Sequence, residues 1–168
     1  MISIHILKKI EQLSREKKFE ELIKVADEFV DEKIRTPGLI NIIGTSILLK
    51  KNRSHEELEK ALKYFEQAHL KGKNSPIELL GICNLITACL QNRRVDFVES
   101  YIFKSEKYYL NVENKFEQDE NFLKAGHELF RHLLDHEKIS NISNKILKLD
   151  NLKSTIKRSN CLFSNLYN

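Results

Sequence analysis

The residues of this chain that could do chemistry gather in one short segment, from Glu128 to His136. If this segment is one helix, Glu128, His132 and His136 follow each other at four-residue steps and share one stripe. Two histidines at that spacing can share a metal ion, and a glutamate can add an oxygen ligand. A catalytic zinc motif of the HExxH kind would instead place glutamate after the first histidine, where this chain has Leu133. We therefore expect a solvated, titratable face, with no metal site and no cofactor.

The rest of the sequence offers little that could support catalysis. It contains no glycine-rich phosphate loop, no Ser/His/Asp order with a nucleophile turn, and no pair of carboxylates set apart on apolar ground. The three cysteines, Cys83, Cys89 and Cys161, are odd in number and form no CxxC motif. We interpret them as reduced core cysteines rather than metal ligands or disulfide partners. These observations predict a protein that is not an enzyme.

Length and composition describe one ordinary globular domain. The chain has 168 residues, of which 41% are hydrophobic and 31% are charged, and this is enough to bury a continuous core. No segment reaches the roughly 18 to 20 consecutive apolar residues of a membrane-spanning helix. Near the start, lysines follow the apolar residues instead of preceding them, unlike in a secretory signal. We expect a single cytoplasmic domain over residues 1–168, without membrane contact.

The hydrophobic pattern predicts an all-α protein. Only five glycines and two prolines are present, and apolar residues recur at three- and four-residue steps. Thr36-Pro37 and Ser75-Pro76 are typical helix starts, and Ser54 and Ser75 are each followed three residues later by glutamate, as in a capping box. We expect four antiparallel helix pairs at about 3–33, 37–71, 76–110 and 121–149, and a C-terminal capping helix at 152–166.

An internal repeat supports the division into helix pairs. Residues 38–74 align without a gap on residues 75–111, at an offset of 37 residues, which is the separation of Gly44 and Gly81. This offset is typical of a two-helix repeat. Four identical positions fall on the helix faces expected to be buried: Ile40/Ile77, Gly44/Gly81, Leu48/Leu85 and Tyr64/Tyr101. In the third pair we expect the second helix at about 94–110.

The first helices of the second and third pairs are apolar on nearly every side. In residues 39–49 and 77–90 the apolar residues are interrupted by only a few small or polar residues. These helices must therefore be covered on most sides. Gly44 and Gly81 would then allow a neighbouring helix to approach closely. Two interpretations remain open: the apolar surface is plain core, or part of it is a groove for a hydrophobic segment of a partner.

Several motifs resemble tetratricopeptide repeats. Ala61-x3-Phe65-x2-Ala68 resembles the second-helix signature, Ile43-Gly44 and Leu80-Gly81 stand where the family has Leu-Gly, and residues 146–151 are similar to its closing segment. The central units are about three residues longer than the family's 34, and the chain has no tryptophan. The resemblance covers about residues 3–151. It implies a right-handed superhelix whose first helices line a concave surface that binds a peptide or a helix of another protein.

A second resemblance concerns Arg131-x4-His136, with His132 directly after the arginine. This is similar to the Arg-x4-6-His motif of HEPN-domain ribonucleases, which are all-helical and usually dimeric. The resemblance implies that Arg131 would stabilise a phosphate and that His136 would act as acid or base on RNA. A HEPN-like ribonuclease or toxin is therefore the alternative function.

Positive charge is concentrated at the C-terminal end. Residues 138–168 contain six cations and one anion, Asp150, while the rest of the chain is nearly neutral. An acidic protein surface or a nucleic acid could use this charge, with Phe163 and Tyr167 as stacking groups. Lysine dominates over arginine, however, and this favours the solvated outer face of a capping helix over a nucleic-acid site.

Together these observations predict a right-handed α-solenoid that acts as a non-catalytic protein-interaction module, an adaptor or a chaperone. It would bind a partner helix or extended peptide in a concave groove along the first helices. The polar candidates for this contact are Asn41, Thr45, Glu78, Asn84, Thr87, Glu128, Arg131 and His132.

Overall fold

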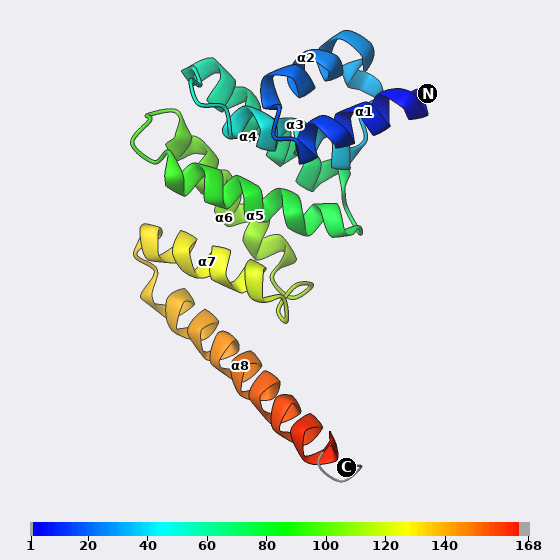
Figure 1. The fold of residues 1–168 in the computed structure, drawn as a ribbon. Helices are drawn as coiled ribbons and strands as arrows, with labels where there is room; N and C mark the ends of the chain where they lie inside the picture. Colours follow the sequence, from blue (N-terminus) through cyan, green and yellow to red (C-terminus); the bar gives the residue numbers. More distant parts are fainter. Residues whose placement is uncertain (1, 165–168) are drawn as a thin grey trace. The chain divides into compact units, whose positions relative to one another are not determined.

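The computed structural model describes the backbone of residues 2–164 and the side chains of residues 2–154. Within the described backbone there are eight α-helices, one short 3-10 helix and no β-strand (Figure 1). The prediction of an all-α protein is therefore confirmed. Contacts divide the chain into two compact units, Met1–Ser105 (unit 1) and Glu106–Asn168 (unit 2), whereas the length and composition predicted one domain.

The helices are bounded as follows. Those that begin in unit 1 are α1 (Ile4–Arg15), α2 (Phe19–Phe29), the 3-10 helix η1 (Glu32–Ile34), α3 (Pro37–Leu48), α4 (His55–Lys71), α5 (Pro76–Gln91) and α6 (Val98–Val112). Those that lie wholly in unit 2 are α7 (Glu120–Leu133) and α8 (His136–Ser164). Helix α6 begins later than the predicted residue 94, because residues 92–97 form turns.

Capping side chains explain where the central helices begin. The Thr36 hydroxyl accepts a hydrogen bond from the Leu39 amide at 3.3 Å, with proline at the first helical position of α3. Ser54 and Glu57 form the predicted capping box. The box predicted at Ser75 is wrong, because the Glu78 carboxylate accepts from the Asn74 amide at 2.8 Å, and Ser75 caps α5 alone.

The expected capping helix at 152–166 is not a separate element. Helix α8 runs without a break from His136 to Ser164 and includes the predicted second helix of the fourth pair. Residues 149–152 contain neither glycine nor proline, and Asp150 and Asn151 disfavour a helix interior by only about 0.7 kcal/mol each. Nothing in this segment therefore ends the helix. The apolar residues expected on the cap lie outside the described side chains: Ile156, Leu162, Phe163 and Leu166.

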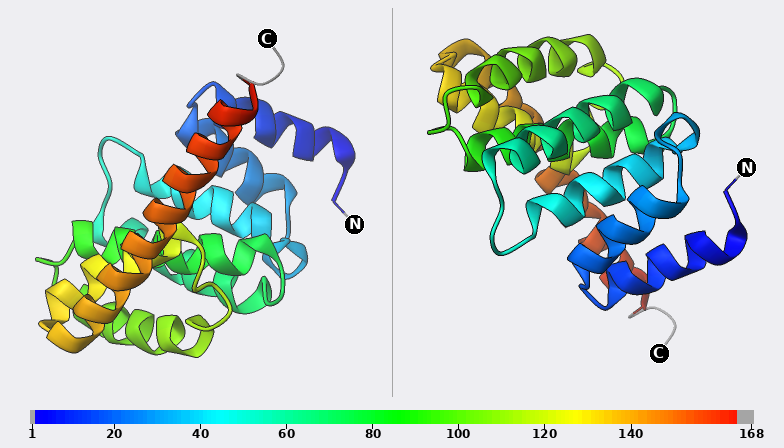
Figure 2. Two further views of the ribbon diagram at one scale, coloured as in Figure 1. Left: turned by 90° about the horizontal axis from the view of Figure 1, so that it is seen from below. Right: turned by 90° about the horizontal axis from the view of Figure 1, so that it is seen from above.

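In unit 1, helix α3 contacts α2, α4 and α5, so it is covered by both earlier and later parts of the chain (Figure 1; two further views in Figure 2). Seven residues of α3 and seven of α5 are buried. This agrees with the prediction that both helices are covered on most sides. The solenoid arrangement and its right-handedness stay predictions.

Gly81 lets α5 approach the backbone of α4. A Cβ at this position would lie 2.5 Å from the backbone nitrogen of His69 and 2.9 Å from its Cα, so no side chain fits. At Gly44, the equivalent position of α3, a Cβ would meet the Phe65 ring at 3.1 Å and the Tyr64 Cβ at 3.2 Å. The two glycines therefore have a packing role, and the constraint is tighter at Gly81 because the neighbour is backbone.

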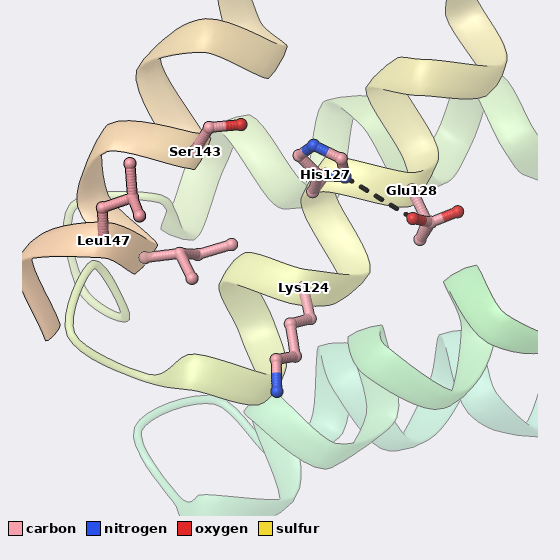
Figure 3. A pocket seen from close by; sticks show the side chains of 6 residues that line it. Lys124, His127, Glu128, Ser143 and Leu147 are labelled. Carbon is pink, nitrogen blue, oxygen red and sulfur yellow. Dashed lines mark ion pairs between the residues drawn. The ribbon is translucent and has the colours of Figure 1, made fainter. Parts of the chain in front are cut away.

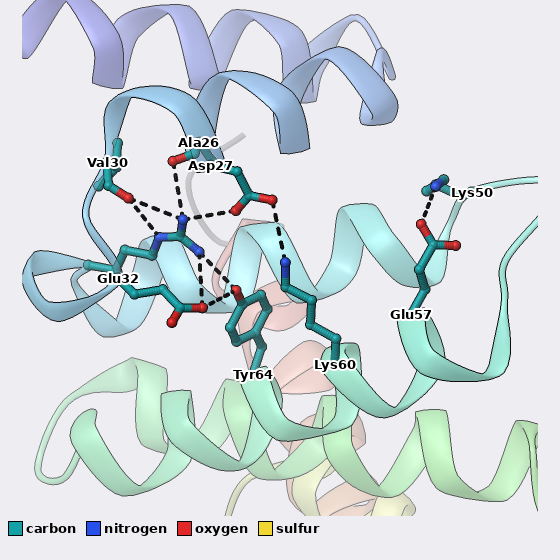
Figure 4. A network of polar contacts seen from close by, with 9 residues as sticks. Ala26, Asp27, Val30, Glu32, Lys50, Glu57, Lys60 and Tyr64 are labelled. Atoms are coloured by element: carbon teal, nitrogen blue, oxygen red, sulfur yellow. Dashed lines mark hydrogen bonds and ion pairs between the residues drawn. The ribbon is translucent and has the colours of Figure 1, made fainter.

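Arg35, between η1 and α3, closes the C-terminal end of α2. Its side chain is 3% exposed and donates to the carbonyl oxygens of Ala26 at 3.2 Å and Val30 at 3.1 Å (Figure 4). The same guanidinium donates to the Asp27 carboxylate at 2.9 Å and to the Tyr64 hydroxyl at 2.8 Å. A buried cation thus provides a donor to the Val30 carbonyl at the end of α2 and a second donor to the Ala26 carbonyl, which also accepts from the Val30 amide.

Tyr64 extends this network from α2 and η1 to α4. Its hydroxyl donates to the Glu32 carboxylate at 2.9 Å, and Lys60, one turn earlier on α4, lies 3.4 Å from Asp27 (Figure 4). Burial raises the pKa of Tyr64, and the bond to Glu32 raises it further, so the hydroxyl stays a donor at neutral pH. The network fixes the first helix pair against the second.

In unit 2 an aromatic cluster joins α6 to α7. The buried ring of Tyr109 stacks on Phe122, with centroids 4.1 Å apart, and meets Phe130 edge-on at 5.4 Å. Gly126 faces the Tyr109 ring so closely that a Cβ there would overlap it. The glycine in α7 is therefore required by the position of this tyrosine.

Ion pairs hold α8 in unit 2. Glu113 lies 3.2 Å from Lys138 and 3.5 Å from Lys145, and Glu120, at the start of α7, pairs with Lys153. Lys153 pairs with the first residue of α7, and α8 continues to Ser164. The last turns of α8 therefore extend past the N-terminal end of α7. Three cations of the basic C-terminal segment are therefore paired within unit 2.

We expect Arg35→Met to destabilise the protein by about 3 kcal/mol, because it leaves several helix-end and carboxylate acceptors without their buried donor. Tyr64→Phe, which removes one hydroxyl from the same network, should cost about 1 kcal/mol. Urea unfolding of both variants, followed by circular dichroism, measures these differences. A loss for Arg35→Met no greater than that for Tyr64→Phe would contradict the central role of the guanidinium.

We expect Gly81→Ala to destabilise the protein by about 2 kcal/mol or more, because the backbones of α4 and α5 must separate. Gly44→Ala should change stability by less than about 1 kcal/mol, since a ring can shift and alanine favours the helix. The thermal midpoints of the two variants, compared with the wild type, give the order. Equal losses would show that the close approach of backbone at Gly81 is relieved without cost.

Candidate functional site

The structure brings together three of the predicted contact residues on α3 and α5. The Asn84 amide nitrogen donates to the Asn41 side-chain oxygen at 3.0 Å, and the Thr45 hydroxyl donates to the Asn41 carbonyl at 2.9 Å. Asn41 is buried, whereas Thr45 and Asn84 are half-buried. A part-buried hydrogen bond between residues 43 positions apart therefore joins α3 to α5.

Exposed residues of α5 continue from this contact. Thr87 is exposed one turn after Asn84, and Leu80 is 43% exposed one turn before it. Residues separated by three or four positions lie on the same face of a helix. We name Thr45, Leu80, Asn84 and Thr87 the α3–α5 surface, which is a mixed apolar and hydroxyl-bearing face on the first helices.

Glu78 does not belong to this surface. It is buried, its carboxylate accepts from the Asn74 amide, and its carbonyl oxygen lies 3.0 Å from Nδ1 of His69. These contacts fix the turn between α4 and α5. Asn41, also buried, likewise supports the structure, so neither side chain can form a large contact with a partner while unit 1 keeps this fold.

A separate groove lies in unit 2 between α7 and α8. It has a volume of about 560 Å³ and is lined by Lys124, His127, Glu128, Ser143, Ile146 and Leu147 (Figure 3). Glu128 is exposed and lies 3.5 Å from His127 and 2.7 Å from Arg131. Of the predicted contact residues in this segment, only Glu128 lines the groove.

The proposed stripe of Glu128, His132 and His136 is interrupted. Helix α7 ends at Leu133, Leu134 has a left-handed backbone with φ of 59°, and His136 begins α8. The Asp135 carboxylate caps α8 by accepting from the Lys138 amide at 2.9 Å, which starts a new helix. Among the described side chains, no group of three His, Cys, Asp or Glu residues could hold a metal ion.

Arg131 and His136 lie on different helices, α7 and α8, and both are exposed. Arg131 is 67% exposed and pairs with Glu128, while His132 is exposed beside it. Because both side chains are exposed to solvent, their electrostatic interaction with a phosphate would be weaker than at a buried site. The nuclease reading of Arg131 and His136 stays a prediction.

Of the two cysteines whose side chains the structure describes, only Cys89 lies in the core as predicted. Cys89 is buried and Cys83 is half-buried, and neither forms a disulfide. Burial raises the pKa of the Cys89 thiol to about 12, and the Ser105 side chain lowers it by a smaller amount. The third, Cys161, lies outside the described side chains, as do Lys157, Arg158 and Tyr167 of the basic segment.

Sequence reasoning missed the role of Arg35 and the residues of α8 that line the α7–α8 groove, Ser143, Ile146 and Leu147. The position of Arg35 after the apolar end of α2 could have suggested a capping role, but its partner Tyr64 lies 29 positions away.

Among the described residues we find no helix whose length and apolar character would let it span a membrane. Searches of protein-family models, curated proteins and solved structures return no significant match to this chain.

We expect Cys83 to react with a thiol reagent well before Cys89. With a pKa of about 12, roughly one Cys89 thiol in ten thousand is ionised at pH 8, and burial also blocks access. In a Cys161→Ser background, reagent uptake followed by peptide mass spectrometry should place the first label on Cys83 and the second only after urea is added. Equal labelling rates under native conditions would contradict the burial of Cys89.

Proposed function

We propose that this chain is a non-catalytic protein-interaction module, an adaptor or chaperone, and that the α3–α5 surface binds a helix or extended peptide of a partner protein. The observation that carries this proposal is the direct contact of α3 with α5 through Asn41 and Asn84. Two successive first helices thereby present their side chains next to each other.

The chemistry of the surface suits a peptide. Leu80 supplies an exposed apolar contact, and Thr45, Asn84 and Thr87 can donate or accept hydrogen bonds without carrying charge. A surface of this kind matches the apolar and amide groups of a peptide better than a phosphate backbone, which needs cations. The internal repeat at 38–111 and the resemblance to tetratricopeptide repeats support the same reading.

The groove between α7 and α8 is a second place where a peptide side chain could dock, and Leu147 is exposed there. It lies in unit 2, whereas the α3–α5 surface lies in unit 1. The proposal rests on the α3–α5 surface because three predicted contact residues meet there.

A matched set of variants tests the proposal. Thr45→Arg/Thr87→Arg places two bulky charges on the α3–α5 surface, and Gln67→Arg/Ser100→Arg places the same charges on exposed positions of the second helices α4 and α6. The tagged chains are cross-linked in extracts of the native host, and bound proteins are quantified by mass spectrometry. We expect a protein that cross-links to the wild type and to the α4/α6 control but falls about tenfold or more with Thr45→Arg/Thr87→Arg, since such charges disrupt an interface core.

Two results would contradict the proposal. One is a partner that binds all three chains equally, because binding would then lie elsewhere. The other is RNA recovered and cleaved by the wild type but not by Arg131→Ala/His136→Ala, which would favour the nuclease.

A further inference from the structure

The three turns that join the two helices of each pair in unit 1 all carry adjacent basic residues. They are Lys17-Lys18 between α1 and α2, Lys50-Lys51 between α3 and α4, and Arg93-Arg94 between α5 and α6. The alternate connections, from α2 to α3 and from α4 to α5, contain no adjacent basic pair. The basic pairs therefore recur at one kind of turn only.

Contacts in unit 1 place these three turns next to one another. A cavity of about 690 Å³ is lined by residues 17–21 together with residues 49–52, so the first and second turns meet. Arg53 donates to the carbonyl oxygen of Leu48 and, at 2.9 Å, to the side-chain oxygen of Asn92, so the second turn meets the third. We name the six basic residues of these turns the basic edge.

Most of the basic edge is not neutralised by the protein. Lys18 pairs with Glu16 at 2.7 Å, and Lys50 pairs with Glu57. The side chains of the other four, Lys17, Lys51, Arg93 and Arg94, are exposed and form no hydrogen bond or ion pair within residues 2–154. Four unpaired cations along adjacent turns produce a local positive potential that attracts acidic groups.

The cavity in the basic edge adds an apolar contact to this charge. Leu49 and Phe19 both line the cavity; Leu49 is 54% exposed and Phe19 is half-buried. An apolar side chain of a ligand could therefore pack against them. Glu20 and Glu21 also line the cavity. A nucleic acid has a negative charge at every phosphate and would be repelled by these two carboxylates, whereas a peptide can place its acidic residues opposite the lysines only.

We propose that the basic edge binds an acidic peptide segment that carries an apolar anchor residue. The anchor occupies the cavity over Leu49, and the flanking carboxylates face Lys17, Lys51, Arg93 and Arg94. This surface shares no residue with the α3–α5 surface, so the inference goes beyond the proposed function and stands if that proposal fails.

Fluorescence anisotropy with the full chain tests the inference. The probes are a labelled peptide of Glu and Asp residues with one central Leu, its Gln and Asn counterpart, its Leu→Ser counterpart, and a labelled single-stranded RNA. The edge variant is Lys17→Glu/Lys51→Glu/Arg93→Glu. The matched control, Lys33→Glu/Lys71→Glu/Lys73→Glu, makes the same change in net charge at η1, at the last residue of α4 and in the turn between α4 and α5. Circular dichroism verifies that both variants fold.

We expect the wild type and the control to bind the acidic peptide, and salt to weaken this binding. The affinity of the edge variant for the same peptide should be lower by a factor of about ten or more. The neutral peptide should not bind, and the Leu→Ser peptide should bind more weakly than its parent. The Thr45→Arg/Thr87→Arg variant should bind like the wild type. The inference is overturned if the wild type does not bind the acidic peptide, if edge and control variants lose equally, or if RNA binds more tightly and depends on the same three cations.

Discussion

Helix α3 must be covered on nearly all sides, and the arrangement of unit 1 depends on this constraint. Its buried side chains include Leu39, Ile40, Ile43 and Ile47, which point to more than one face of the helix. Water is excluded only when α2, α4 and α5 all pack against it, as they do. The close approach at Gly81 and the Asn41–Asn84 bond then follow, because α5 must lie near both α3 and α4.

The same constraint separates two kinds of polar group. Buried ones, such as Arg35 and Asn41, satisfy helix ends and join helices, and they cannot serve a partner without loss of stability. Exposed ones remain accessible, and they include Thr87 on α5, Gln67 on α4 and the basic edge at the turns. Binding chemistry in unit 1 is thus confined to surfaces that the packing of α3 leaves uncovered.

Part of the candidate site could be predicted from the sequence, and part could not. The sequence identified four polar residues on apolar helices: Asn41, Thr45, Asn84 and Thr87. In the structure Asn41 is buried and cannot contact a partner directly, whereas Thr87 is exposed. Exposure depends on neighbours that are distant in the chain. The predicted common stripe of Glu128 and His136 is wrong because it assumed one helix. Leu134 instead adopts a left-handed backbone, and a new helix begins after it.

The sequence by itself determined the all-α class and the starts of α3 and α4, because periodicity and capping residues such as Thr36 and Ser54 act over a few positions. Only the tertiary structure decided which helices touch, how the chain divides into two units and which polar residues are buried. It alone showed Arg35 joined to Tyr64, and three basic turns side by side. These features depend on contacts between residues tens of positions apart, which no local pattern specifies.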